Sequence, residues 1–205
     1  MKIRPYQICV SGAAAGDTVK SSAKLAYMLG REIAKQGHVL LTGATIGLPY
    51  HAALGAKAAG GLSVGFSPAS SYREHVKIYK LPTDAIDFIN YTGMHYVGRD
   101  NHLVHSSEAI ITVGGRIGSL HEFATAIVGH KVCGVLLGSG GFADFVPLLV
   151  DRIVVPGKER IIYDNQPARL VQRVVDALDE RYSDFDDPSD RMRNYAKSPD
   201  TDREG

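Results

Sequence analysis

Short apolar runs alternate along this chain with longer segments whose apolar residues recur every three or four positions. The runs are bounded by glycine or polar residues and predict strands at residues 6–10, 39–41, 62–66, 87–90, 109–113, 132–137 and 161–163. Helical spacing between them predicts helices that cover residues 25–33, 48–59, 93–106, 123–128 and 171–178. Strand and helix patterns therefore alternate almost from end to end.

This alternation predicts a single doubly wound α/β domain of the Rossmann-like type over residues 1–182. The strands are nearly continuous in apolar character, which is typical of a mostly parallel sheet with helices on both faces. From residue 183 to residue 205 the chain becomes charged and poor in aliphatic side chains, which predicts a disordered C-terminal tail.

Three glycine-rich turns each follow a predicted strand, at residues 11–16, 42–47 and 114–119. Parallel sheets bind ligands at the carboxyl ends of their strands, so all three turns are expected to open on one edge. Glycine lets the backbone approach a phosphate closely, and the free N–H groups of a helix start point at it. The turns predict a site for a nucleotide or another phosphorylated small molecule.

Composition narrows the partners and the compartment. Lys and Arg number 23 against 22 Asp and Glu, a formal charge of +1, which argues against nucleic acid and anionic membrane as main partners. No apolar run is long enough for a membrane span, and the N-terminus does not resemble a signal peptide. The two cysteines, Cys9 and Cys133, lie in predicted core strands, so no disulfide framework is indicated and the cytoplasm is expected.

The segment Gly-Gly-Arg-Ile-Gly-Ser-Leu-His-Glu, residues 114–122, resembles the Pro-Gly-Gly-x-Gly-Thr-x-x-Glu motif of a Rossmann-like superfamily. That superfamily includes the Lonely Guy (LOG) phosphoribohydrolases, proteins mislabelled as lysine decarboxylases, and the molybdenum-cofactor carrier proteins. The resemblance covers roughly residues 8–149 and extends to the turns at 11–13 and 42–48. Arg99 lies where those families carry an arginine upstream of the motif glutamate.

Several positions depart from the hydrolase pattern. Gly114 replaces the proline, Arg116 replaces a glycine, and Ser119 replaces the threonine while keeping its hydroxyl. The hydrolases usually carry Arg-Lys on the helix, and this chain has Arg99-Asp100. The sequence of residues 98–109 is more similar to that of the carrier-like branch.

The resemblance and the chemistry together assign candidate roles. Glu122 and Arg99 are the candidate catalytic residues, since an acid and an arginine beside a phosphate turn suit N-glycosidic cleavage. Glu122 would orient a water or steady charge on the ribose, and Arg99 would hold the base or Glu122 itself. The candidate ligand and phosphate contacts are Ser11, Gly12, Gly43, Thr45, Gly47, Gly114, Gly115, Arg116, Gly118 and Ser119.

Each role has a plain structural alternative. Glu122 is also a residue that the macrodipole favours in a first helical turn, and Arg116 is equally a solvated loop arginine. Small hydroxyl residues such as Ser11 and Thr45 are common in turns for conformational reasons.

No metal site is predicted, because His102, His105 and His121 lack the further converging ligands that zinc needs. The dinucleotide fingerprint is absent, which argues against NAD.

Two functions of different classes remain open at this point. One is hydrolysis of the N-glycosidic bond of a nucleoside 5′-monophosphate, and the other is a non-catalytic carrier or sensor of molybdenum cofactor or a nucleotide. Neither requires a further cofactor, although a bound nucleotide monophosphate or molybdenum cofactor is implied. The alanine-rich segment 52–59 and the resemblance predict a homo-oligomer, a dimer or a tetramer.

Overall fold

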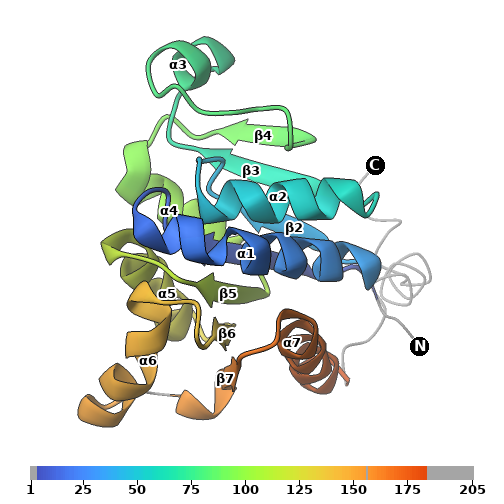
Figure 1. Ribbon diagram of the computed structural model, residues 1–205, viewed down its shortest axis with the longest axis vertical. Helices are drawn as coiled ribbons and strands as arrows, with labels where there is room; N and C mark the ends of the chain where they lie inside the picture. Colours follow the sequence, from blue (N-terminus) through green and yellow to red (C-terminus); the bar gives the residue numbers. More distant parts are fainter. Residues whose placement is uncertain (1–3, 156, 184–205) are drawn as a thin grey trace, which may run out of the picture.

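The computed structural model describes residues 4–155 and 157–183, in which seven parallel strands form one sheet (Figure 1). Their order across the sheet is β4-β3-β2-β1-β5-β6-β7. All seven predicted strands are present, with ends shifted by at most a few residues. The strands are β1 (Gln7–Gly12), β2 (Val39–Thr42), β3 (Ser63–Ser67), β4 (Phe88–Tyr91), β5 (Ala109–Val113), β6 (Val132–Leu136) and β7 (Ile161–Asp164).

Helices cover both faces of the sheet, as the alternating pattern predicts (Figure 1). One face carries α1 (Asp17–Lys35), α2 (Leu48–Ala58) and α7 (Pro167–Arg181). The other carries α4 (His95–His105), α5 (Ile117–Val128) and α6 (Gly141–Arg152). The short α3 (Tyr72–Lys77) lies beside the β4 edge, and a 3₁₀ turn, Lys158–Arg160, precedes β7. The doubly wound α/β prediction is confirmed.

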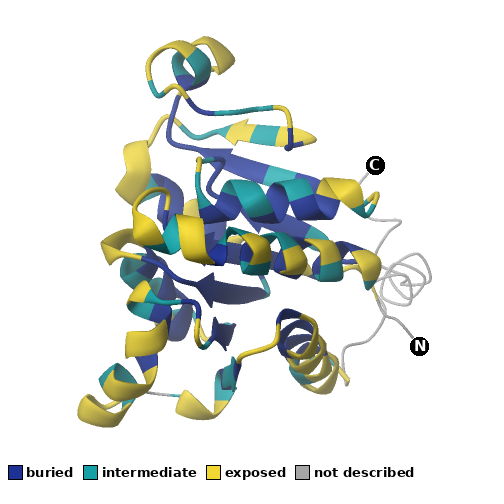
Figure 2. Cartoon of the chain, in the orientation of Figure 1, coloured by how far each residue is buried: buried dark blue, intermediate teal, exposed yellow. Residues whose placement is uncertain are grey.

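The core consists of two apolar layers separated by the sheet, and the central strands are buried on both sides (Figure 2). Successive residues of β1 show the division. Ile8 and Val10 pack into the layer under α1, α2 and α7, whereas Cys9 packs into the layer under α4, α5 and α6. This alternation follows from the two-residue period of a strand. Both cysteines are buried and free.

Helices α1 and α2 approach each other closely through small residues. A Cβ atom built on Gly30 of α1 would lie 2.6 Å from the carbonyl carbon of Ala52, and one on Gly55 of α2 would lie 2.8 Å from that of Tyr27. Of the alanines in segment 52–59, Ala52, Ala53 and Ala56 are buried and serve packing within the chain. This segment no longer supports the predicted homo-oligomer, which stays a prediction.

Strand β1 is the point at which the winding reverses. The chain builds β2, β3 and β4 on one side of β1, and then β5, β6 and β7 on the other. Gly12 at the end of β1 is in register with Val113 at the end of β5. The turns after β1, β2 and β5 consequently meet at one edge, as expected for a topological switch point.

Some predictions fall outside what the structure describes. Of the predicted tail, residues 183–205, only Ser183 lies within the described residues. Among the described helices, none is both long and apolar enough to cross a membrane.

Candidate functional site

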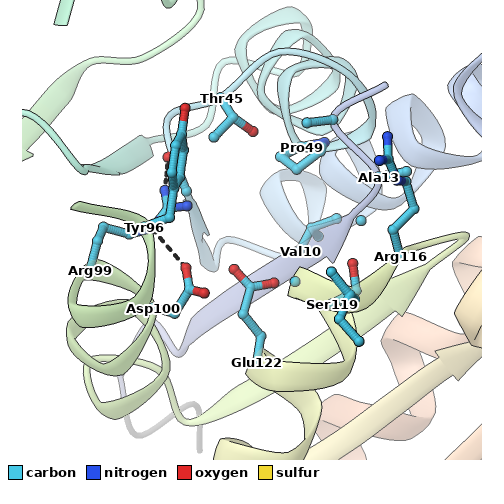
Figure 3. Close-up of a pocket in the computed structure, with 15 residues that line it drawn as sticks. Val10, Ala13, Thr45, Pro49, Tyr96, Arg99, Asp100, Arg116, Ser119 and Glu122 are labelled. Atoms are coloured by element: carbon cyan, nitrogen blue, oxygen red, sulfur yellow. Dashed lines mark hydrogen bonds and ion pairs between the residues drawn. The ribbon is translucent and has the colours of Figure 1, made fainter. Parts of the chain in front are cut away.

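A cleft of about 300 Å³ lies where the carboxyl ends of β1, β2 and β5 meet (Figure 3). Its wall includes residues from all three glycine turns and from helices α2, α4 and α5. The lining residues are Val10, Gly12, Ala13, Ala14, Gly43, Thr45, Pro49, Tyr96, Arg99, Asp100, Arg116, Ile117, Gly118, Ser119 and Glu122. The expected convergence of the three turns is therefore present.

The turn after β5 is held from behind by the loop before α6. The N–H of Gly114 donates to Ser139 Oγ at 2.7 Å, and the carbonyl of Gly114 accepts from the N–H of Ala143 at 2.7 Å. Gly115 has φ of +102°, and a Cβ there would lie 2.8 Å from Ser119 Cβ. Only glycine fits that position without strain, so these two residues shape the turn from behind the cleft wall.

The first turn of α5 faces the cleft with its amides open. Its N-cap residue, Arg116, makes no side-chain capping bond, and the first bond of the helix runs from Leu120 N to Arg116 O at 3.1 Å. The N–H groups before Leu120 therefore have no partner within the helix. A Cβ built on Gly118 would have no atom within 4 Å, so the space in front of this turn is open.

Arg116 adds a positive charge at the same rim. Its side chain is exposed, lines the cleft, and contacts the carbonyl of Ala15 through Nη1 at 3.3 Å. This contact joins the turns after β1 and β5 across the opening. The guanidinium and the open amides of α5 together favour an anion at this end.

The opposite end of the cleft is formed by α4. Tyr96, Arg99 and Asp100 are spaced i, i+3 and i+4 along this helix, so they share one face. Arg99 is buried and donates through Nη1 to the carbonyls of Phe66, at 2.8 Å, and Gly43. It therefore fixes the turn after β2 to the end of β3.

Asp100 forms a buried ion pair with Arg99 of the same helix and a contact with His121 that links α4 to α5. Its Oδ1 accepts from Arg99 Nε at 2.9 Å, and its Oδ2 accepts from His121 Nδ1 at 3.0 Å. Arg99 and Asp100 are buried, whereas His121 is partly exposed. Because a carboxylate only accepts, Nδ1 of His121 is the donor in this contact.

Glu122 lies on the floor of the cleft and accepts a hydrogen bond from Ser11 Oγ. Burial, together with the negative charge of Asp100, raises the pKa of Glu122 to about 7, against the opposing influence of Arg99 and Ser11. A carboxyl group with that pKa exchanges its proton near neutral pH, which suits acid–base chemistry. The partner of Glu122 is thus Ser11, while the hydrogen bonds of Arg99 go elsewhere.

The structure separates the predicted site residues into two groups. The first group lines the cleft and consists of Gly12, Gly43, Thr45, Arg99, Arg116, Gly118, Ser119 and Glu122. The second group lies behind the lining and supports it: Ser11, Gly47, Gly114 and Gly115. For both groups, direct contact with a ligand stays a prediction.

Tyr96 and Asp100 are cleft residues that were not among the predicted site residues. Their helical spacing from Arg99 is the sequence signal that places them on the same face. Ser139 had no such signal, because its partner Gly114 is distant in sequence.

Thr45 Oγ1 donates to the carbonyl of Ile46 at 3.1 Å. Within the described part of the chain, no group of three or more His, Cys, Asp or Glu side chains gathers to hold a metal ion.

Comparison of this chain with known proteins shows which family it belongs to. An uncharacterised protein of Archaeoglobus fulgidus is 37% identical over 121 residues, which are 59% of this chain and 73% of that protein. The molybdenum cofactor binding protein of Rippkaea orientalis is 28% identical, with a TM-score of 0.68 over 85% of this chain and 98% of that one.

The molybdenum cofactor carrier protein of Chlamydomonas reinhardtii is 27% identical, with a TM-score of 0.70 over 85% of this chain and 99% of that one. The model of the SLOG cluster4 family matches residues 5–171. These matches confirm the superfamily resemblance inferred from the glycine motif. This chain belongs to the SLOG cluster4 family.

Proposed function

We propose that this protein binds a phosphorylated small molecule, with the phosphate against the first turn of α5 and the remainder directed toward α4. The observation that carries the proposal is the uncapped start of α5, which opens into the cleft beside Arg116 and in front of Gly118. A phosphate supplies the acceptors that these amides lack and the negative charge that the guanidinium favours.

A carrier or sensor role is the function we favour. The solved relatives from Rippkaea orientalis and Chlamydomonas reinhardtii are named as a binding protein and a carrier protein of molybdenum cofactor. The cargo of this chain would be molybdenum cofactor or a nucleoside 5′-monophosphate. Arg99, the counterpart of a hydrolase arginine, is already occupied by two carbonyls and Asp100, which agrees with a binding role.

Substitution of Gly118 tests the binding site directly. Gly118→Asp places a carboxylate in the open space where the phosphate would lie, while an acid in a first helical turn is itself favourable to the helix. We expect the binding of GMP, followed by calorimetry, to weaken at least tenfold without a loss of melting temperature.

Gly118→Ala is the matched control, because a methyl group there meets no atom within 4 Å. We expect it to weaken GMP binding less than the Asp variant does, since it adds a methyl group to that space but no charge. Undiminished binding by the folded Asp variant would contradict the placement of the phosphate.

Hydrolysis of a nucleoside 5′-monophosphate is the second candidate, and Glu122 is the observation that favours it. Its carboxylate would take a proton from water as the oxygen bonds to C1′ of the ribose and the bond from C1′ to the base nitrogen breaks. The base nitrogen takes up a proton from solvent as it leaves, and Glu122 returns its own proton to solvent, so the products are free base and ribose 5-phosphate. A pKa of about 7 suits Glu122 to this proton transfer.

Chromatography of AMP and GMP incubated with the protein distinguishes the two candidates. Hydrolysis would be established if the native protein releases free base and the Glu122→Gln variant does not. Intact nucleotide together with a raised melting temperature would support the carrier or sensor role.

The assembly and the compartment remain proposals. A homo-oligomer would be seen as a dimer or tetramer mass in light scattering. The exposed apolar side chains Val97 of α4 and Val128 of α5 are a candidate contact surface for it. A cytoplasmic location without a nucleic-acid partner remains our expectation from composition.

A further inference from the structure

The two ends of the cleft carry opposite chemistry. At the α5 end are Arg116 and the open amides, which donate hydrogen bonds. At the α4 end are the carboxylate of Asp100 and the ring of Tyr96, with Glu122 on the floor between the ends (Figure 3). A ligand with its phosphate at α5 therefore presents its other end to an acceptor and an aromatic ring.

The carboxylate of Asp100 lines the cleft and retains acceptor capacity beyond its two partners within the chain. Its two oxygens offer about four lone-pair sites. One site on Oδ1 is used by Arg99 and one on Oδ2 by His121. Both partners hold the carboxylate in one orientation at the cleft wall, and each oxygen keeps a second site. Such a fixed carboxylate pairs with two adjacent N–H donors and repels a ring acceptor.

Tyr96 offers a flat surface beside that carboxylate. Its ring is about half exposed and lines the cleft. It is held by Arg99, whose Cζ lies 5.8 Å from the ring centroid, and by an edge-to-face contact with Tyr79 at 5.7 Å. A fixed aromatic ring stacks on planar heterocycles of many kinds, so it contributes affinity and leaves selection to Asp100.

We propose that Asp100, with Tyr96 as the stacking surface, selects a ring whose edge carries adjacent N–H donors, as guanine and pterin do through a ring N–H and a 2-amino group. Adenine is disfavoured, because its N1 is an acceptor and carbon 2 carries no amino group. The inference rests on the proposed function, since it requires the phosphate at α5. It adds the class of ring and the residue that reads it.

A nucleotide series on the native protein tests this selection without any substitution. Calorimetry with GMP, IMP and AMP varies the ring edge while the ribose phosphate stays constant. IMP keeps the N1–H but lacks the 2-amino group. We expect GMP to bind at least tenfold more tightly than AMP, with IMP between them, which is the range for a paired hydrogen-bond contact. Equal binding of GMP and AMP, or tighter AMP, would overturn the selection.

Two further ligands are tested in the same way. One distinguishes pterin from guanine as the preferred ring, and the other tests the proposed phosphate site by itself. 6-Hydroxymethylpterin monophosphate carries the same donor edge, so tighter binding than AMP supports the selection, and its ratio to GMP tells pterin from guanine. Inorganic phosphate at millimolar concentration reports the α5 end alone through the melting temperature. If phosphate and all these ligands fail to bind, the proposed function fails with the inference. If AMP and GMP bind equally, only the inference fails.

Asp100→Asn then assigns the selection to this residue. The amide replaces one acceptor by a donor, so we expect the GMP to AMP affinity ratio to fall to within about threefold, with inorganic phosphate binding kept. Arg116→Gln is the control, and it should weaken GMP and AMP by the same factor. A folded Asp100→Asn protein that keeps the native ratio would overturn the role of Asp100. Should the variant unfold, the native nucleotide series decides the selection.

Discussion

The two ends of the cleft are built in opposite ways. At the α4 end, Arg99 and Asp100 are buried and each has charged or polar partners within the chain. At the α5 end, Arg116 is exposed and the first turn of the helix lacks a cap. The charged groups of one end are paired with each other before any ligand arrives, whereas the other end has donors that await an acceptor.

This difference teaches where stability and affinity reside. Groups that are buried and paired cost stability when one partner is removed, because the other partner remains buried without compensation. Removal of an exposed donor changes the stability of the fold little, but it weakens the binding of a ligand that needs that donor. Removal of a buried charge partner at the α4 end should therefore change folding, whereas removal of an exposed donor at the α5 end should change binding alone.

The largest effect is expected from Arg99→Met. The variant leaves Asp100 buried without its guanidinium and removes the donor to the carbonyls of Gly43 and Phe66. We expect the free energy of unfolding to fall by about 3–5 kcal/mol. Urea denaturation measures it. The matched Arg116→Met at the exposed end should change it by less than about 0.5 kcal/mol. Equal losses in the two variants would break the comparison between the ends.

The next effect is a pH dependence that Glu122→Gln should remove. The pKa of Glu122 is about 7 in the folded protein and near 4.5 in the unfolded chain. Between these values the folded state holds a proton that the unfolded state has released, so the free energy of unfolding falls as pH rises. The limiting loss is about 3 kcal/mol.

Urea denaturation at pH 5 and pH 8 checks this sign. The Gln variant keeps a neutral group at both values, so it should gain stability relative to the native protein at pH 8. The same change with pH in both proteins would show that Glu122 is not the group responsible.

A smaller effect is expected from Arg116→Gln on ligand affinity. The loss of one charge-assisted contact should weaken GMP binding about tenfold and leave the melting temperature of the free protein unchanged. Calorimetry at low and high salt separates charge from shape, because the deficit of the variant should shrink as salt screens the native contact. A deficit that is independent of salt would sink this assignment.

The smallest effect is expected from Tyr96→Leu. Loss of the stacking surface should weaken GMP binding about fivefold, since base–aromatic stacking is worth ~1 kcal/mol or more. Inorganic phosphate should bind as before, because it lacks a ring. Tyr96→Phe keeps the ring and should retain native affinity for GMP in the same titration.

The sequence predicted the secondary structure correctly wherever the apolar residues of a segment kept one regular spacing. Apolar runs predicted each strand in the part of the chain that the structure describes, and the glycine turns predicted the edge where the cleft lies. Helix α6 was missed because Pro147 interrupts its pattern, and α3 because it is short and polar. The placement of Arg99 was predicted, but its partners were not. They come from the turn after β2, from β3 and from α4 itself, and the fold brings the first two to Arg99.

The central claim is that a ligand phosphate lies against the first turn of α5. Amide chemical shifts recorded during a titration with GMP test it most directly. We predict that the largest shifts belong to Ile117, Gly118 and Ser119, with smaller shifts on α4. Absent shifts on α5 would contradict the account. So would shifts concentrated around Arg169 and Arg173 of α7, whose side chains donate to Asp164 at the end of β7.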